Sequence, residues 1–149
     1  MVGVAAPAHT RVRRRGVFRL KLRGNGGVCM NGQISWYVEL VIKPGRLESF
    51  RALTGEMVES ARRELGILSY QRFASEDGKT VHVYERYADS TAALTHLGIF
   101  AKKFAKPFQD MVERKCFFVF GHPTAELKEA LDRFGAIYFK PFGDFSYWT

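Results

Sequence analysis

Residues 67–87 read ILSYQRFASEDGKTVHVYERY, and this stretch decides the fold. It contains two runs rich in β-branched and aromatic residues, Ile67–Ala74 and Thr80–Tyr87, and a short polar connection that includes Asp77 and Gly78. An Asp-Gly pair between two extended runs is a strong hairpin signal, because both residues tolerate the backbone angles of a tight turn. The stretch therefore predicts two neighbouring antiparallel strands.

Upstream of the hairpin, the sequence predicts one strand and one helix. Apolar and other residues alternate along Ile34–Ile42, as expected of a strand with one buried face. Apolar residues in Arg46–Leu65 then recur at steps of three or four, the spacing of an amphipathic helix. Gly66 is placed to end that helix.

Downstream, the pattern continues with helices and strands in turn. Asp89 or Ser90 is suited to cap a helix over Thr91–Phe104, and residues 108–114 add a further helical turn or two. The remaining predicted elements are a dense apolar strand at Cys116–Phe120, a short helix at Pro123–Phe134 and a last strand at Ala136–Lys140.

The order β-α-β-β-α-β predicts an α+β, ferredoxin-like fold with two helices on one face of an antiparallel sheet. We assign residues 34–121 to this domain and residues 122–149 to a helix–strand extension of it. The second face of the sheet is not consistently polar, since Tyr37 shares a side with Val41, and Leu68 with Tyr70 and Ala74. Such a face needs a cover, so we expect a homodimer that pairs two sheets.

The net charge of +8 comes mainly from residues 1–33, which hold seven cations and no acid. This segment is expected to be a disordered tail. A start codon assigned too early, a transit peptide and a basic arm all remain open for it. Because the rest of the chain is nearly neutral, nucleic-acid binding is not expected. Nor is a membrane span, since no apolar run is long enough.

The two cysteines, Cys29 and Cys116, make no disulfide framework, which favours a reduced, cytoplasmic setting. No cluster of cysteine and histidine has zinc spacing, so no metal site is expected.

Glu85 and His96 are the candidate catalytic residues. Glu85 shares strand parity with Val81 and Val83, and a carboxylate on an apolar face would have a raised pKa suited to a general base. An ion pair with Arg or Lys, or a strand end that reaches solvent, is the alternative. His96 lies on the packed side of its helix, where it could accept a proton or simply bind a backbone carbonyl or Glu85.

Several aromatic side chains could line a flat, apolar pocket for a hydrophobic aromatic molecule. Ordinary core packing or a dimer interface is the alternative for each of them. The candidates for substrate binding are Tyr37, Phe50, Tyr70, Phe100 and Phe104.

Three segments resemble the antibiotic biosynthesis monooxygenase domains, which are small dimeric α/β-barrel proteins that include quinol monooxygenases. The first is Glu85-Arg86-Tyr87-Ala88-Asp89-Ser90-Thr91-Ala92 with His96. The second is Val38-Glu39-Leu40 with Pro44-Gly45 and Phe50, and the third is Glu64-Leu65-Gly66-Ile67-Leu68-Ser69-Tyr70. The resemblance covers roughly residues 34–121.

The resemblance implies a dimer of ferredoxin-like protomers with a cavity between sheet and helices. It also implies a monooxygenase that oxidises a quinol or phenol with O₂ and needs no cofactor. Such members use an Asn on the first strand, whereas this sequence has no Asn after Asn31. Where haem-degrading members place a catalytic His, it reads Phe100-Ala101-Lys102-Lys103-Phe104, so haem degradation is not expected. A non-catalytic dimeric module for binding small molecules or for stress response is the alternative.

Overall fold

The computed structural model describes residues 32–143 of the 149-residue chain. The expectation for the basic tail falls almost wholly outside these residues, as does the last part of the predicted extension, residues 144–149. The order of elements is the predicted one, but the helical turns expected over residues 108–114 lie at Ala105–Met111, and residues 112–114 belong to the fourth strand. The strands are β1 (Ile34–Ile42), β2 (Ile67–Ala74), β3 (Thr80–Tyr87), β4 (Val112–Gly121) and β5 (Ile137–Phe139). The helices are α1 (Leu47–Ala61), α2 (Ser90–Lys103), α3 (Ala105–Met111) and α4 (Ala125–Asp132).

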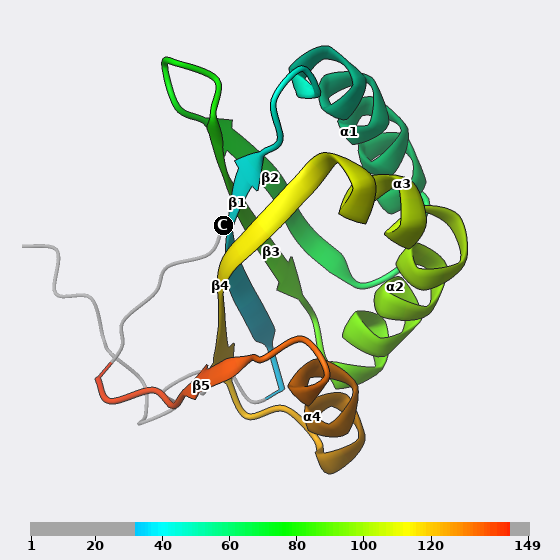
Figure 1. Cartoon of the computed structure of the whole chain (residues 1–149). Helices are drawn as coiled ribbons and strands as arrows, with labels where there is room; N and C mark the ends of the chain where they lie inside the picture. The colour runs from blue at the N-terminus through cyan, green and yellow to red at the C-terminus, as the bar shows by residue number, and fades with distance from the viewer. Residues whose placement is uncertain (1–31, 144–149) are drawn as a thin grey trace, which may run out of the picture.

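The five strands form one open sheet in the order β2-β3-β1-β4-β5. The first four strands pair antiparallel, which confirms the ferredoxin-like arrangement, whereas β5 joins β4 in parallel. The parallel pairing follows from the connection, because a strand that returns through a helix re-enters the sheet in the same direction. The helices lie together on one side of the sheet (Figure 1), so its other face carries no helix.

The core lies between the sheet and the helices. Every second residue of β1 is buried, from Ile34 to Ile42, as the alternation predicts. Leu127 and Leu131 of α4 are fully buried in the same cluster, so the C-terminal extension packs on the domain core. Within the described residues, no helix is long and apolar enough to cross a membrane.

A bulge at the start of β2 corrects the predicted faces of this strand. Ile67 pairs with Tyr87 and Ser69 with Arg86, so two steps along β2 match one step along β3. The extra residue, Leu68, is about half exposed, and Tyr70 comes to lie opposite the buried Glu85. Tyr70 and Ala74 therefore do not share a face with Leu68, because one inserted residue reverses the parity of everything after it.

The end of α1 also differs from the prediction. The helix ends at Ala61, and Arg62–Leu65 form turns before Gly66, whose φ is +84°. The prediction extended the helix to Leu65 because apolar spacing continues through it, yet Leu65 is 93% exposed. The predicted cap of the next helix is confirmed, since the Asp89 side chain accepts a hydrogen bond from the Ala92 amide at 2.8 Å.

Candidate functional site

Glu85 is the centre of a buried polar network between the sheet and the helices. Its side chain is 5% exposed. One carboxylate oxygen, Oε2, accepts hydrogen bonds from the Trp36 indole at 2.5 Å and from the Tyr87 hydroxyl at 2.6 Å. The other oxygen, Oε1, accepts from Arg72 Nη2 at 2.6 Å. Three donors and one guanidinium charge thus compensate the burial of this carboxylate, as a buried anion requires.

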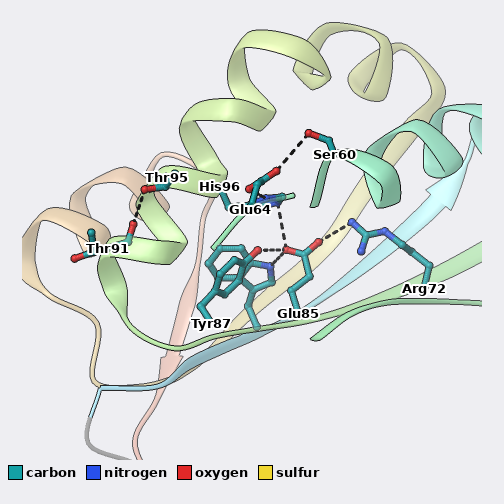
Figure 2. A network of polar contacts seen from close by, with 9 residues as sticks. Ser60, Glu64, Arg72, Glu85, Tyr87, Thr91, Thr95 and His96 are labelled. Atoms are coloured by element: carbon teal, nitrogen blue, oxygen red, sulfur yellow. Dashed lines mark hydrogen bonds and ion pairs between the residues drawn. The ribbon is translucent and has the colours of Figure 1, made fainter. Parts of the chain in front are cut away.

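The strand register explains why these donors meet. Trp36 of β1 and Tyr70 of β2 are the cross-strand neighbours of Glu85 in β3, on either side of it. Arg72 lies two residues beyond Tyr70 on the same face of β2, and its guanidinium carbon lies 3.5 Å from the centre of the Tyr70 ring. In Figure 2, Arg72 reaches Glu85 from the side opposite to Tyr87. The ion pair between Glu85 and Arg72 is one of the alternatives that the sequence left open for Glu85.

His96 joins this network from α2. Its side chain is 7% exposed, its Nε2 lies 3.8 Å from Glu85 Oε2, and its Nδ1 lies 2.8 Å from Glu64 Oε2. The Tyr70 ring meets the imidazole edge-on, with 5.3 Å between the ring centres. His96 therefore bridges two buried carboxylates (Figure 2), and a protonated imidazole together with Arg72 would balance both of them.

The two tyrosines of the network are held in their neutral form. Burial raises the pKa of the Tyr87 phenol well above its usual value, and the Glu85 carboxylate beside it raises this pKa further. Burial also raises the pKa of Tyr70, again with a contribution from Glu85. Tyr87 is thus a hydrogen-bond donor to Glu85 throughout the physiological pH range.

A cavity of about 80 Å³ opens beside Glu85 and Arg72. Valine side chains of the sheet, Val38 and Val83, line one side, and helix residues that include Phe100 and Phe108 line another. At the β4 side, Arg114 lies over the Phe134 ring, 5.3 Å from its centre, and burial lowers its pKa. The remaining lining residues are Trp36, Leu97 and Phe117. The cavity is therefore apolar and aromatic, with a carboxylate and two guanidinium groups at its wall.

The two predicted catalytic residues lie next to each other. The aromatic residues predicted to bind substrate, however, do not line one common cavity. Glu85 and Phe100 line the cavity, whereas His96 lies behind Glu85. Tyr70 packs against Arg72 and His96. Phe50 contacts Phe108 and lines a second cavity, and Phe104 belongs to a separate cluster with Leu53 and Met57.

Tyr37 does not line either of these cavities. Its neighbours across the sheet are Tyr84 and Phe118, and its ring lies 5.2 Å from that of His82. Tyr37 alternates with the buried Trp36 and Val38, so it lies on the helix-free face. Burial raises its pKa as well.

Five residues of the site were not among the predicted site residues. Tyr87 shares strand parity with Glu85, and Trp36 belongs to the alternating buried residues of β1, so both could have been found from the sequence pattern. Arg72 was hidden by the bulge, which places it on the cavity side. Glu64 reaches His96 only because α1 ends early. Arg114 belongs to a strand at the cavity because β4 begins at Val112 rather than at Cys116. In residues 32–143, no three acidic, cysteine or histidine side chains are arranged to hold a metal ion.

Comparison with known proteins finds a family that matches part of the chain and solved structures with a similar fold. Residues 34–99 match the family described as antibiotic biosynthesis monooxygenase. The structure is similar to MupZ from Pseudomonas fluorescens, with a TM-score of 0.71 and 24% identity over 78% of this chain and 96% of MupZ. No curated protein sequence matches the chain.

Two smaller proteins share the fold over a shorter part of the chain. A Bacteroides thetaiotaomicron protein described as an antibiotic biosynthesis monooxygenase is 28% identical, with a TM-score of 0.53 over 58% of this chain and 86% of its own. Rv0793 from Mycobacterium tuberculosis is 22% identical, with a TM-score of 0.54 over 62% of this chain and 96% of its own. Residues 34–99 of this chain are therefore similar to the antibiotic biosynthesis monooxygenase family.

Proposed function

We propose that the protein is a cofactor-independent monooxygenase that oxidises a quinol or phenol with O₂ in the cavity beside Glu85. The observation that carries this proposal is the pairing of a carboxylate and a guanidinium, Glu85 and Arg72, at the wall of a cavity whose other lining residues are aromatic and aliphatic except for Arg114. A ring fits between apolar walls, while its hydroxyl group needs a polar partner. The family match supports a monooxygenase or a binding protein for small molecules.

In this mechanism, the substrate hydroxyl donates a proton to Glu85, and Arg72 stabilises the resulting oxyanion. The anion transfers one electron to O₂, and recombination of the two radicals forms a carbon–oxygen bond on the ring. One oxygen atom remains in the product, a hydroxyquinone from a quinol or a quinone from a phenol, and the other leaves as water. His96, whose Nε2 lies 3.8 Å from Glu85 Oε2, acts on Glu85 as a positioning residue. The protein contributes orientation, exclusion of water and a base.

The test is oxygen uptake with a reduced naphthoquinone and chelator-treated protein. We expect turnover by the wild type and a loss of about 100-fold or more in Glu85→Gln, the range for removal of a general base. Glu113→Gln is the matched control, since Glu113 is an exposed carboxylate of β4 that pairs with Lys115. Glu85→Gln turnover equal to that of Glu113→Gln would exclude Glu85 as the base.

A binding protein without catalysis is the second candidate, and one observation favours it. Glu85 already receives three short hydrogen bonds, so its pairing is satisfied without a ligand. Saturable binding of an oxidised naphthoquinone, with no oxygen uptake in the presence of the reduced form, would establish this function instead.

We also propose that the protein is a homodimer that joins the helix-free faces of two sheets. Apolar residues are exposed on this face in β2, β4 and β5, among them Phe73, Phe120 and Phe139. The Phe120 and Phe139 rings stack with their centres 5.5 Å apart, and Phe118 meets Phe139 edge-on. Exposed apolar side chains of this kind are typical of a protein interface, and a second copy offers the matching surface.

A further inference from the structure

A second cavity shares one lining residue, Arg72, with the first. It has a volume of about 110 Å³ and lies between α1 and the strands β1, β2 and β3. Apolar residues such as Phe50 and Val81 form most of its wall. Its polar lining consists of two arginines and one threonine, Arg51, Arg72 and Thr54, and no carboxylate lines it.

Arg72, which lines both cavities, has hydrogen-bond donors left over. Its side chain is only 10% exposed, and it uses Nη2 for Glu85. Its Nε and Nη1 atoms are buried and have no hydrogen-bond partner among the described residues. Unpartnered hydrogen-bond donors of a buried charged group are rare in proteins and energetically costly. Two such donor atoms on one guanidinium therefore indicate that an acceptor is missing.

Thr54 independently indicates the same missing acceptor. Its hydroxyl oxygen, Oγ1, is buried and unpartnered within residues 32–143, although helix geometry allows a threonine hydroxyl to bind a carbonyl of the preceding turn. Thr54 and Arg72 come from different elements, α1 and β2, and both line this cavity. Two unsatisfied donors from separate elements at one cavity are the pattern of a binding site rather than of a packing defect.

We propose that this second cavity binds the carboxylate of a small apolar acid. The acid's oxygens would accept hydrogen bonds from Arg72 and from the Thr54 hydroxyl, while the apolar wall receives its carbon chain. Arg51 also lines the cavity; its side chain is 71% exposed and lies 4.0 Å from the exposed carboxylate of Glu48, so its guanidinium adds only a weak second attraction for an anion. A carboxylate fits this lining because every polar side chain in it can donate a hydrogen bond. The inference concerns another cavity than the oxygenase proposal, although Arg72 lines both cavities.

The probe pair is isobutyrate and isobutyramide, which have the same shape but differ in charge. Binding to the full chain is measured by titration calorimetry and by saturation-transfer NMR. We expect saturable, millimolar binding of isobutyrate and at least about tenfold weaker binding of the amide, because a hydrogen bond to a charged group contributes more than a neutral one.

Thr54→Val is the decisive variant. It removes a buried hydroxyl that has no partner in the free protein, so the stability of the free protein should be unchanged or higher. Isobutyrate binding should nevertheless weaken about tenfold, which a purely structural role would not produce. Arg51→Gln should weaken it by up to about fivefold, as expected for an exposed charge. Thr95→Val is the matched control, since Thr95 lies on α2 and bonds the Thr91 carbonyl (Figure 2).

Three results would overturn the proposal. The first is equal binding of isobutyrate and isobutyramide, and the second is unchanged isobutyrate binding in Thr54→Val. The third is no saturable binding of either probe, which would mean that ordered water satisfies Arg72 and Thr54. Because all readouts are binding and stability, they keep their meaning whether or not the neighbouring cavity oxidises a quinol.

Discussion

Trp36 and Glu85 face each other across β1 and β3, and the indole nitrogen of Trp36 donates a hydrogen bond of 2.5 Å to Glu85 Oε2. The same pair of residues therefore fixes the register of two central strands and holds the carboxylate at the cavity. Tyr87 adds a second donor to the same oxygen from two residues further along β3.

Trp36→Phe should lower the free energy of unfolding by about 2 kcal/mol. Phenylalanine keeps an aromatic ring against Tyr87 and Phe117 but removes the donor, and a hydrogen bond to a charged group contributes about 1.5–3 kcal/mol. Urea denaturation measures the change. In a double-mutant cycle, the loss of stability in the double variant with Glu85→Gln should be smaller than the sum of the two single losses. A loss equal to that sum would show that the hydrogen bond between Trp36 and Glu85 contributes nothing.

The fold could be predicted from the sequence because apolar residues recur at regular spacings along its strands and helices. The alternation in β1 and the Asp-Gly turn before β3 identify the central strands with their exact bounds. Asp89 also marks the start of α2 to within one residue. These signals are local, and each depends on the nearest few residues.

The site was only partly predictable because it depends on irregular backbone. The bulge at Leu68 turns Arg72 toward the cavity, and nothing in the alternation of β2 reveals it. The early end of α1 brings Glu64 to His96, although apolar spacing continues past Ala61. Pairings between distant segments decide such features, so a pattern read along the chain misses them.

Tyr87 should make the protein lose stability at high pH. Its pKa in the folded protein is raised above the ordinary value of 10, so the neutral phenol is favoured by folding. The stabilisation is complete below about pH 10 and is lost as the pH rises above it, by up to about 1.4 kcal/mol per pH unit for one group. Denaturation at several pH values from 8 to about 12 measures this slope.

Tyr87→Phe should therefore show a shallower alkaline slope than the wild type. Trp36→Phe is the matched control, because it also removes a donor to Glu85 Oε2 but leaves the phenol in place. It should be less stable at every pH yet keep the wild-type slope. Parallel slopes for the wild type and Tyr87→Phe would contradict the assignment of this titration to Tyr87.

Gly66→Ala should destabilise the protein by about 2 kcal/mol or more. Gly66 has a φ of +84°, where a residue with a β-carbon costs about 1–2 kcal/mol, and its added Cβ would lie 2.6 Å from the Ala92 Cβ. The Gly66 carbonyl also accepts a hydrogen bond from the Ala88 amide. Thermal and urea denaturation measure the loss, and Gly55→Ala is the control, since Gly55 lies inside α1 with open space around it. Alanine at Gly55 should leave stability equal or higher, because alanine favours a helix.

Phe120→Arg should convert the proposed dimer into a folded monomer. Phe120 is 38% exposed on the helix-free face and stacks on Phe139, so an arginine there would place a charge in the apolar centre of the interface. Sedimentation equilibrium at micromolar concentration should give twice the chain mass for the wild type and one chain mass for the variant. Leu65→Arg is the matched control, because Leu65 is 93% exposed but precedes β2 and lies outside the sheet. A wild-type protein of one chain mass would refute the dimer, and a monomeric Leu65→Arg would move the interface away from the sheet.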